Sequence, residues 1–409
     1  MEKEITSEQY KFGDLTEMVL CFIETFVNEN PLLYIEANFK QLIFKAVYNI
    51  TSLTLKDIYL LEFDDIEENI YENIQYYFNT VGLKRSYRHS IIVKSPNAEL
   101  IENKLVVLNS LKQPEQKSEA WYIYRHNLLT ASSIWKALDS ESAKNSLIYK
   151  KCCPLNLNKC FGVNINSAMH WGQKYEPISA MFYENLYKTK IGEYGCIQHQ
   201  QQSFLGASPD GINIKKDNTR YGRMLEIKNI VNREITGIPK KEYWVQMQLQ
   251  MEVCDLDECD FLETRFKEYE NKEAFLKDGG YGCDKIRGVI VCFHSNGGPI
   301  YKYAPLYTTC DEISCNKWID TCMESNQTMT WIKNAYWVLD EYSCILVPRN
   351  QDWFKNALPP FKKLWDTILY ERIHGYVHRK PKRKEKSKNI ILKVRTESFD
   401  ESRIQTSET

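Results

Sequence analysis

The sequence lacks the features of a membrane or secreted protein. No apolar run in its 409 residues approaches the roughly 18 residues that a membrane-spanning helix needs. The N-terminal segment, residues 1–6, is acidic and has no apolar signal region. These absences predict an intracellular protein, in the cytoplasm or nucleus, that is neither secreted nor bound to a membrane.

Cysteines in zinc-site spacing are also absent. The chain has 13 cysteines, an odd number, and no close group among them has the two-residue spacing that structural zinc sites favour. Without a secretory signal, we predict free thiols in a reducing compartment rather than a disulfide framework.

The net charge is close to zero, but acidic and basic residues are concentrated in different parts of the chain. The chain carries 53 basic and 54 acidic residues, which gives a formal charge of −1. Residues 1–80 hold 15 acidic and 5 basic side chains, whereas residues 372–395 hold 10 basic and 1 acidic. Clustered charge sets a local field, so a nucleic-acid partner is not excluded. A phosphate-binding arm, a nuclear-import signal or a solvated tail would each explain the basic run Arg379, Lys380, Lys382, Arg383 and Lys384.

Composition and apolar spacing divide the chain into four parts. Residues 1–115 repeat apolar positions at helical spacing and predict a helical N-terminal domain. Residues 116–310 mix helical and strand patterns and form the predicted core. Residues 311–375 predict a helical and strand extension of that core. Residues 376–409 are polar and charged and predict a basic, flexible tail.

A predicted hairpin brings two carboxylates together. In the strand pattern of residues 223–229 (RMLEIKN), the alternation of side chains places Glu226 and Lys228 on the same face. Upstream, a Ser-Pro-Asp-Gly turn places Asp210 at a strand end, and a hairpin would return the chain to Glu226. Adjacent carboxylates repel unless a divalent cation lies between them, and oxygen ligands suit Mg²⁺ or Mn²⁺. The alternatives are a solvated strand edge and an aspartate that caps its own turn.

Two helical patterns flank this hairpin. Glu176 directly precedes Pro177, which removes one helical hydrogen bond and frees a backbone carbonyl. Downstream, Tyr243, Gln246 and Gln250 fall on one stripe of a predicted helix. A glutamine there would orient a water or a phosphate oxygen by hydrogen bonding. Two plain amphipathic helices are the alternative interpretation.

The ordered set of Glu, Asp, Glu-x-Lys and a glutamine-bearing helix resembles the PD-(D/E)xK nuclease superfamily. Within it, the chain resembles the lambda-exonuclease and YqaJ-like viral recombinase family over about residues 118–300. A further segment, WYIYRHNLLTAS, is similar to the opening motif of that family, in which an Arg is followed seven residues later by a Ser. The segments that carry the resemblance are residues 121–132, 171–176, 208–211, 225–228 and 243–248.

The resemblance implies an α/β fold with a restriction-endonuclease-like mixed sheet flanked by helices, behind the helical N-terminal domain. It implies a Mg²⁺-dependent exonuclease, with Mn²⁺ as a substitute, that degrades linear double-stranded DNA from 5′ to 3′. The remaining 3′ single strands would serve viral-type recombination or repair. The implied metal ligands are Glu176, Asp210, Glu226 and the carbonyl of Ile227. The resemblance implies that Lys228 and Gln246 are catalytic residues together with the three acids. It also implies that Arg125 and Ser132 hold the 5′-phosphate of the DNA end.

The resemblance also implies partners. These are double-stranded DNA ends, a single-strand annealing protein and further copies of the chain in a trimeric ring. For a viral protein, the compartment would be the cytoplasm or nucleus of the host cell. Two other functions stay open at this point: a structure-specific or repair endonuclease on the same fold, and a non-catalytic DNA-binding protein.

Overall fold

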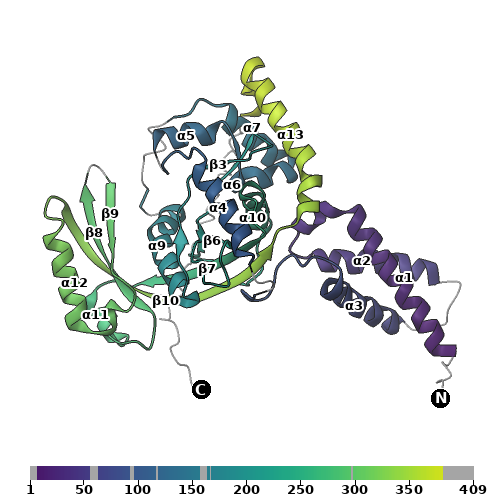
Figure 1. Cartoon of the computed structure of the whole chain (residues 1–409), viewed down its shortest axis with the longest axis horizontal. Helices are drawn as coiled ribbons and strands as arrows, with labels where there is room; N and C mark the ends of the chain where they lie inside the picture. Colours follow the sequence, from purple (N-terminus) through teal and green to yellow (C-terminus); the bar gives the residue numbers. More distant parts are fainter. Residues whose placement is uncertain are drawn as a thin grey trace, which may run out of the picture.

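The computed structural model describes residues 7–55, 63–92, 96–116, 118–156, 164–165, 167–295 and 298–380. A mixed sheet with helices on both faces forms the centre, and a bundle of N-terminal helices stands to one side (Figure 1). This confirms the predicted α/β class with a mixed sheet and a helical N-terminal region. None of the described helices combines the length and the apolar character that a bilayer crossing requires.

The main sheet has seven strands. Only β6 and β7 are parallel neighbours among the described strands of this sheet, and the other adjacent pairs are antiparallel. Their spatial order is β2 (Ile191–Gly192), β5 (Gly211–Asn213), β6 (Met224–Asn229), β7 (Glu258–Glu268), β10 (Thr330–Pro348), β8 (Arg287–Ser295) and β9 (Gly298–Tyr303). A smaller sheet has the order β1 (Leu129–Thr130), β4 (Leu205–Ala207) and β3 (Ile197–Gln198).

The long strand β10 lies inside the main sheet. Its C-terminal half pairs with β7 and its N-terminal half pairs with β8. Residues 330–348, within the predicted extension, therefore share one sheet with the preceding core. At the far end of this sheet, α11 (Lys272–Lys277) and α12 (Glu312–Glu324) flank a buried cluster that includes Phe275, Val291 and Phe293 (Figure 1).

Two helices cover the half of the sheet that contains β6. Helix α9 (Ala168–Tyr187) packs Phe182 and Tyr183 against Leu225 and Ile227 of β6. Helix α10 (Lys241–Cys254) lies on the opposite face. Because side chains alternate along β6, Glu226 and Lys228 face α10, as the sequence predicts.

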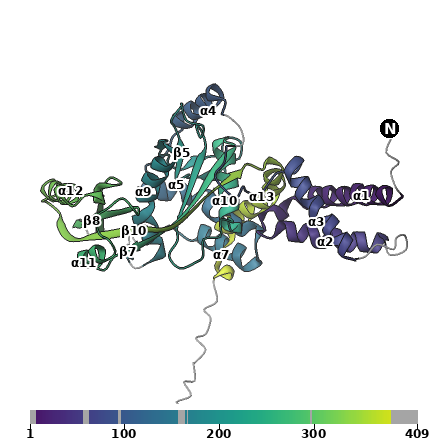
Figure 2. The same cartoon turned by 90° about the horizontal axis from the view of Figure 1, so that it is seen from below.

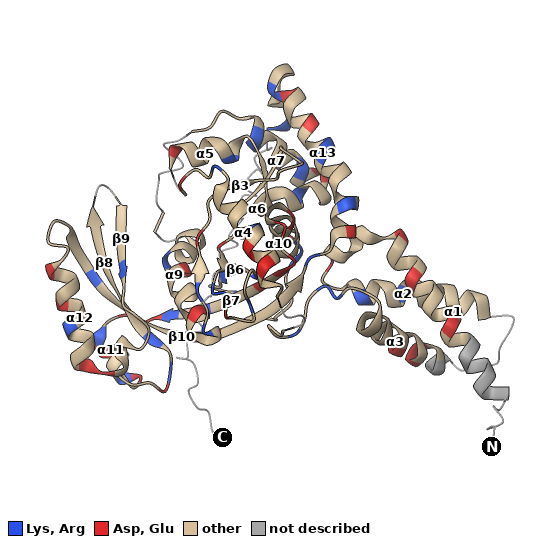
Figure 3. Ribbon diagram, viewed as in Figure 1, with Lys and Arg blue, Asp and Glu red and all other residues tan. Residues whose placement is uncertain are grey.

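The N-terminal helical region has two separate parts. The bundle consists of α1 (Ser7–Glu29), η1 (Pro31–Ile35), α2 (Phe39–Leu55) and α3 (Phe63–Thr80), and it stands at the opposite end of the molecule from α11 and α12 (Figure 2). Acidic residues outnumber basic ones on α1 and α3, whereas α2 carries two lysines and no acidic residue (Figure 3). Helix α4 (Ala98–Ser110), by contrast, packs on the core, where Lys104 pairs with Asp255. The single predicted domain of residues 1–115 is therefore divided between bundle and core.

Three short helices and one long helix surround the small sheet. These are α5 (Glu119–His126), α6 (Ala131–Ile134) with η2 (Trp135–Leu138), α7 (Glu141–Cys152) and α13 (Gln351–His374). Trp353, Phe361 and Ile368 of α13 are fully buried and join the core cluster that includes α10.

The beginning of the predicted basic tail belongs to the folded body. Residues 377–379 form a 3-10 turn, η4 (Val377–Arg379). The Arg379 guanidinium donates to both carboxylate oxygens of Glu371, at 2.7 and 2.6 Å, and also contacts Asn145. Arg379 is thus a structural ion-pair partner rather than part of a free arm, and Lys380 is exposed. Lys382, Arg383 and Lys384 lie outside the described residues.

The expectation of free thiols is wrong at one pair of cysteines. Cys283 and Cys310 form a disulfide with 5.0 Å between their Cα atoms. It joins the segment after α11 to η3 (Thr308–Cys310), just ahead of α12. These two residues are 27 positions apart in the chain, and their spacing gave no sign of the pairing. The other cysteines in the described parts of the chain are free.

Candidate active site

The β5–β6 hairpin brings Asp210 and Glu226 together as predicted. Gly211 of β5 pairs with Leu225 of β6, so the residues beside them in the chain become neighbours. Asp210 Oδ2 accepts a 2.7 Å hydrogen bond from the backbone N–H of Ile227. This bond holds the Asp210 carboxylate beside the strand that carries Glu226 and Lys228.

Glu226 is fully buried and is held by three side-chain donors. Its Oε1 accepts from Lys228 Nζ and, at 2.7 Å, from Gln246 Nε2. Its Oε2 accepts from Gln250 Nε2, also at 2.7 Å. Gln246 and Gln250 lie one helical turn apart on α10, which confirms the predicted stripe. Gln250 was not among the predicted site residues, although its place on that stripe was the signal for it.

The site around Asp210 and Glu226 has more negative than positive charge. Burial raises the pKa of Asp210 well above its usual range, and the neighbouring Glu226 raises it further. Burial lowers the pKa of Lys228, but Glu226 and Asp210 outweigh burial and the net pKa is raised. Two carboxylates thus share one ammonium here. A divalent cation on these hard oxygen donors would remove the imbalance, so the residues present fit Mg²⁺.

Glu176 comes from a different element of the fold. It is an exposed residue of α9, the helix on the opposite face of the sheet. Its charge reaches Asp210 and contributes to raising the pKa of that carboxyl group. Among the described residues, however, no three Asp, Glu, His or Cys side chains group closely enough to hold a metal ion. Glu176 and the carbonyl of Ile227 therefore remain predicted ligands.

A second group of polar side chains, which we call the Arg125 pocket, surrounds the guanidinium of Arg125 near the C-terminus of α5. Its Nη1 donates to Ser208 Oγ at 2.9 Å, and its Nη2 donates to Ser132 Oγ at 3.4 Å. The guanidinium carbon lies 4.3 Å from the centre of the Trp121 ring. The structure thus brings the predicted pair Arg125 and Ser132 together. It adds Ser208, which lies in the recognised Asp turn but was not among the predicted site residues.

Ser208 and Gln250 join the two pockets. Gln250 Nε2 donates to Ser208 O at 3.3 Å as well as to Glu226 Oε2. Ser208 in turn accepts the hydrogen bond from Arg125. A continuous series of contacts therefore runs from the Arg125 guanidinium to the buried carboxylate of Glu226.

The match to a known protein family covers the residues of both pockets. Residues 120–257 match the model of the YqaJ-like viral recombinase domain and form a domain of this family. Each predicted catalytic and phosphate-binding residue lies within this YqaJ-like domain. The N-terminal bundle, β10 and α13 lie outside it.

Comparisons with individual proteins found a viral protein of similar sequence and solved bacterial structures of low similarity. The chain is 31% identical over 357 residues to "Uncharacterized protein R354" of Acanthamoeba polyphaga mimivirus. The alignment covers 76% of this chain and 62% of the length of that viral protein. A solved structure, an alkaline exonuclease (LHK-Exo) from Laribacter hongkongensis, matches 64% of this chain and 97% of its own, with 19% identity and a TM-score of 0.37. The structure of LHK-Exo with dAMP gives 18% identity and the same TM-score.

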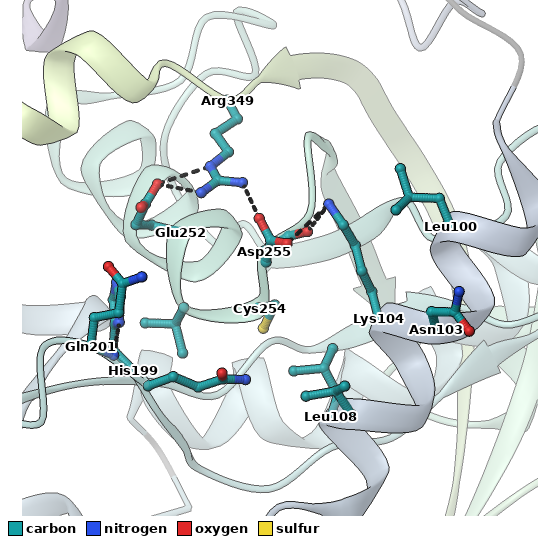
Figure 4. Close-up of a pocket in the computed structure, with 13 residues that line it drawn as sticks. Leu100, Asn103, Lys104, Leu108, His199, Gln201, Glu252, Cys254, Asp255 and Arg349 are labelled. Carbon is teal, nitrogen blue, oxygen red and sulfur yellow. Dashed lines mark hydrogen bonds and ion pairs between the residues drawn. The ribbon is translucent and has the colours of Figure 1, made fainter.

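A large cavity lies at the edge of the YqaJ-like domain, away from the two pockets. It encloses about 480 Å³ between α4 and the C-terminus of α10 (Figure 4). Arg349 bridges Glu252 and Asp255, each at 2.7 Å, and Lys104 of α4 pairs with Asp255 at 3.1 Å. None of the predicted site residues is among the described residues that line it. This region attaches α4 to the core.

Proposed function

We propose that the protein is a divalent-metal-dependent DNA exonuclease. It degrades linear double-stranded DNA from 5′ to 3′ and leaves 3′ single strands for viral-type recombination or repair. The observation that carries this proposal is the series of contacts from Arg125 through Ser208 and Gln250 to Glu226. An anion pocket joined to a hydrolytic site suits a substrate that presents a terminal phosphate next to the bond to be cut.

The residues of the first pocket have distinct roles in this proposal. Asp210 and Glu226, with Glu176 and the Ile227 carbonyl, would hold Mg²⁺ or Mn²⁺. When bound, the cation supplies an activated water and stabilises charge on the phosphoryl oxygens. Lys228 places a fixed positive charge beside that phosphoryl group. Gln246 and Gln250 fix the orientation of Glu226.

The Arg125 pocket would bind the terminal phosphate. A guanidinium presents a planar fork that matches phosphate oxygens. The hydroxyl groups of Ser132 and Ser208 lie within hydrogen-bond distance of that fork and can donate to the same anion. This pocket is the reason to favour an exonuclease over an endonuclease, because the carboxylates and Lys228 serve both reactions equally.

Digestion of a 5′-labelled linear duplex in Mg²⁺ tests the proposal. We expect Glu226→Ala and Lys228→Ala to lose about 100-fold or more of the wild-type rate. Glu273→Ala, which changes an exposed carboxylate on α11, should digest at the wild-type rate. If both site variants digested the duplex normally, the site assignment would be wrong.

The form of the substrate separates the alternatives. An exonuclease degrades linear duplexes and leaves covalently closed circles intact, whereas an endonuclease cuts both. Metal-independent DNA binding without any cleavage would instead identify a non-catalytic binding protein.

We propose two kinds of partner for this activity. A 3′ single strand is the substrate of a single-strand annealing protein, and further copies of the chain would enclose the duplex in a trimeric ring. Light scattering of the purified protein tests the trimeric ring, and a measured mass equal to that of a single chain would contradict the ring. Co-purification with an annealing protein from the same genome tests the annealing partner. Because the relative R354 is viral, we place the activity inside an infected cell.

A further inference from the structure

The last turn of α5, which carries Arg125, is held by two cationic side chains from distant parts of the chain. Lys151 of α7 donates from Nζ to Arg125 O at 2.6 Å and to Leu128 O at 2.5 Å. Arg372 of α13 donates from Nη2 to His126 O at 3.0 Å. Carbonyls at a helix C-terminus lack partners within the helix and carry partial negative charge, so cations stabilise this position.

Arg372 also holds Lys151. Its Nε and Nη2 donate to Lys151 O at 3.0 and 2.9 Å, and its Nη1 donates to Asn127 Oδ1 at 3.2 Å. The C-termini of α5 and α7 are thus tied to one guanidinium on α13. The place of Arg125 therefore depends on residues 26 and 247 positions further along the sequence.

This group of cations has no acidic partner in the described parts of the chain. No described ion pair joins Arg125, Lys151 or Arg372 to a carboxylate, although Lys151 is only 6% exposed. Burial, together with the charges of Arg125, Lys150 and Arg372, lowers the pKa of Lys151 to about 7. Burial, together with the charges of Arg372 and Lys151, likewise lowers the pKa of His126 to about 4. The local potential is strongly positive and lacks a counter-charge.

We propose that Lys151 and Arg372 are positioning residues that set both the place and the electrostatic environment of Arg125 for a terminal phosphate. Their hydrogen bonds fix the helical turn from which Arg125 projects. Their charges make the pocket favourable for a doubly charged anion rather than for a neutral hydroxyl end. This inference rests on the proposed function, since it assigns the terminal phosphate of a DNA strand to the Arg125 pocket.

A pH dependence follows from the titration of Lys151. The groups that face it are Arg125 and His126 on α5, Lys150 on its own helix, Arg372 on α13 and the Cys196 thiol ahead of β3. A bound phosphate favours the protonated amine, so binding takes up a proton and raises the pKa of Lys151. As the pH rises above about 7, the free protein loses the charge of Lys151 and the affinity for a phosphorylated end falls.

The test compares duplexes that carry a 5′-phosphate or a 5′-hydroxyl group. Affinity is measured by fluorescence anisotropy in EDTA, between pH 6 and pH 9, so that the readout does not depend on cleavage. For the wild type we expect the preference for the phosphorylated end to fall as pH rises through neutrality. Lys151→Met should lose about 10-fold of this preference at pH 6.5, because a charged hydrogen-bonding group is removed. Arg372→Met should also lower the preference for the phosphorylated end over the hydroxyl end.

Two further variants separate positioning from general effects. Lys150→Met removes the same charge from the neighbouring, exposed position on α7 and should keep the preference within about twofold. Lys151→Arg keeps a charge that does not titrate in this range, so its preference should be independent of pH above about pH 7, where the terminal phosphate is already doubly charged. If Lys151→Met does not fold, Arg372→Lys and the wild-type pH profile still test the proposal.

The outcomes distinguish this inference from the proposed function. A preference that is unchanged in Lys151→Met and Arg372→Met, and flat with pH in the wild type, would overturn the positioning role. Cleavage by the wild-type enzyme would then still support the nuclease. Conversely, absence of Mg²⁺-dependent cleavage with an intact, pH-dependent preference would overturn the nuclease and leave the phosphate pocket standing.

Discussion

Two fully buried carboxylates on neighbouring strands are stabilised in opposite ways. Glu226 of β6 faces α10, whereas Asp260 of β7 faces α9, where Tyr183 donates to it at 2.6 Å. Asp260 also accepts from Arg220 at 3.2 Å and from Arg223 at 3.1 Å. Glu226 accepts from a single cation, Lys228, and from two neutral amides.

The balance of charge is what differs between the two sites. Around Asp260, Arg223 also pairs with Glu258, so two guanidinium groups meet two carboxylates. Around Glu226, the second carboxylate is Asp210, and Lys228 is the one ammonium that acts on both among the described residues. A balanced buried network stabilises the fold, whereas an unbalanced one needs a cation from outside. The comparison therefore predicts a structural role for Asp260 and a functional role for Asp210 and Glu226.

The largest expected effect is on stability. Asp260→Asn leaves Arg220 and Arg223 buried without their shared counter-charge, and we expect it to lower the free energy of unfolding by about 3–5 kcal/mol. Urea denaturation measures this change. Glu226→Gln is the matched control on the other face and should cost less, about 1–2 kcal/mol, because its amide keeps one acceptor oxygen for these donors and Asp210 remains as a counter-charge for Lys228. Equal destabilisation by the two variants would remove the distinction.

A smaller effect is expected from two glutamines of α10. Gln250→Leu removes a donor from Glu226 and should lower the rate of Mg²⁺-dependent cleavage by about 10- to 100-fold. Gln248 instead donates to Pro348 O at 2.9 Å and accepts from Asn350 N at 2.7 Å. Gln248→Leu should therefore lower the melting temperature while cleavage per folded molecule stays near the wild-type rate. The reverse pattern would show that Gln250 has only a structural role.

The smallest expected effect is a gain in stability. Because Asp210 is buried beside Glu226, its ionised form costs folding free energy at neutral pH. Asp210→Asn keeps an acceptor for the Ile227 N–H and should raise the melting temperature in EDTA by about 2 °C, close to 1 kcal/mol. Added Mg²⁺ should raise the melting temperature of the wild type but not of this variant. A destabilised variant in EDTA would contradict the charge imbalance.

The local part of the site could be predicted from the sequence. The alternation of residues 223–229 gave the shared face of Glu226 and Lys228, and the turn before Gly211 gave the position of Asp210. These features depend on strand period and turn chemistry, which act over a few residues. The stripe on α10 gave the approach of Gln246 for the same reason.

The long-range part could not be predicted. Lys151 and Arg372 reach the C-terminus of α5 from other helices, and no periodicity links them to Arg125. The place of β10 between β7 and β8 also depends on pairing between strands that are far apart in the chain. The Cys283–Cys310 disulfide was missed because it joins two segments that meet only through the fold.

The strand β10 connects the two ends of the sheet through one continuous backbone. Its 19 residues pair with β8 at the end that carries α11 and α12, and with β7, the neighbour of β6, at the other end. The register of this pairing shifts once between Trp331 and Lys333 and once between Leu339 and Glu341. A chain cut before β10 would leave unpaired the edge of β7 that β10 covers, where other chains could add as strands.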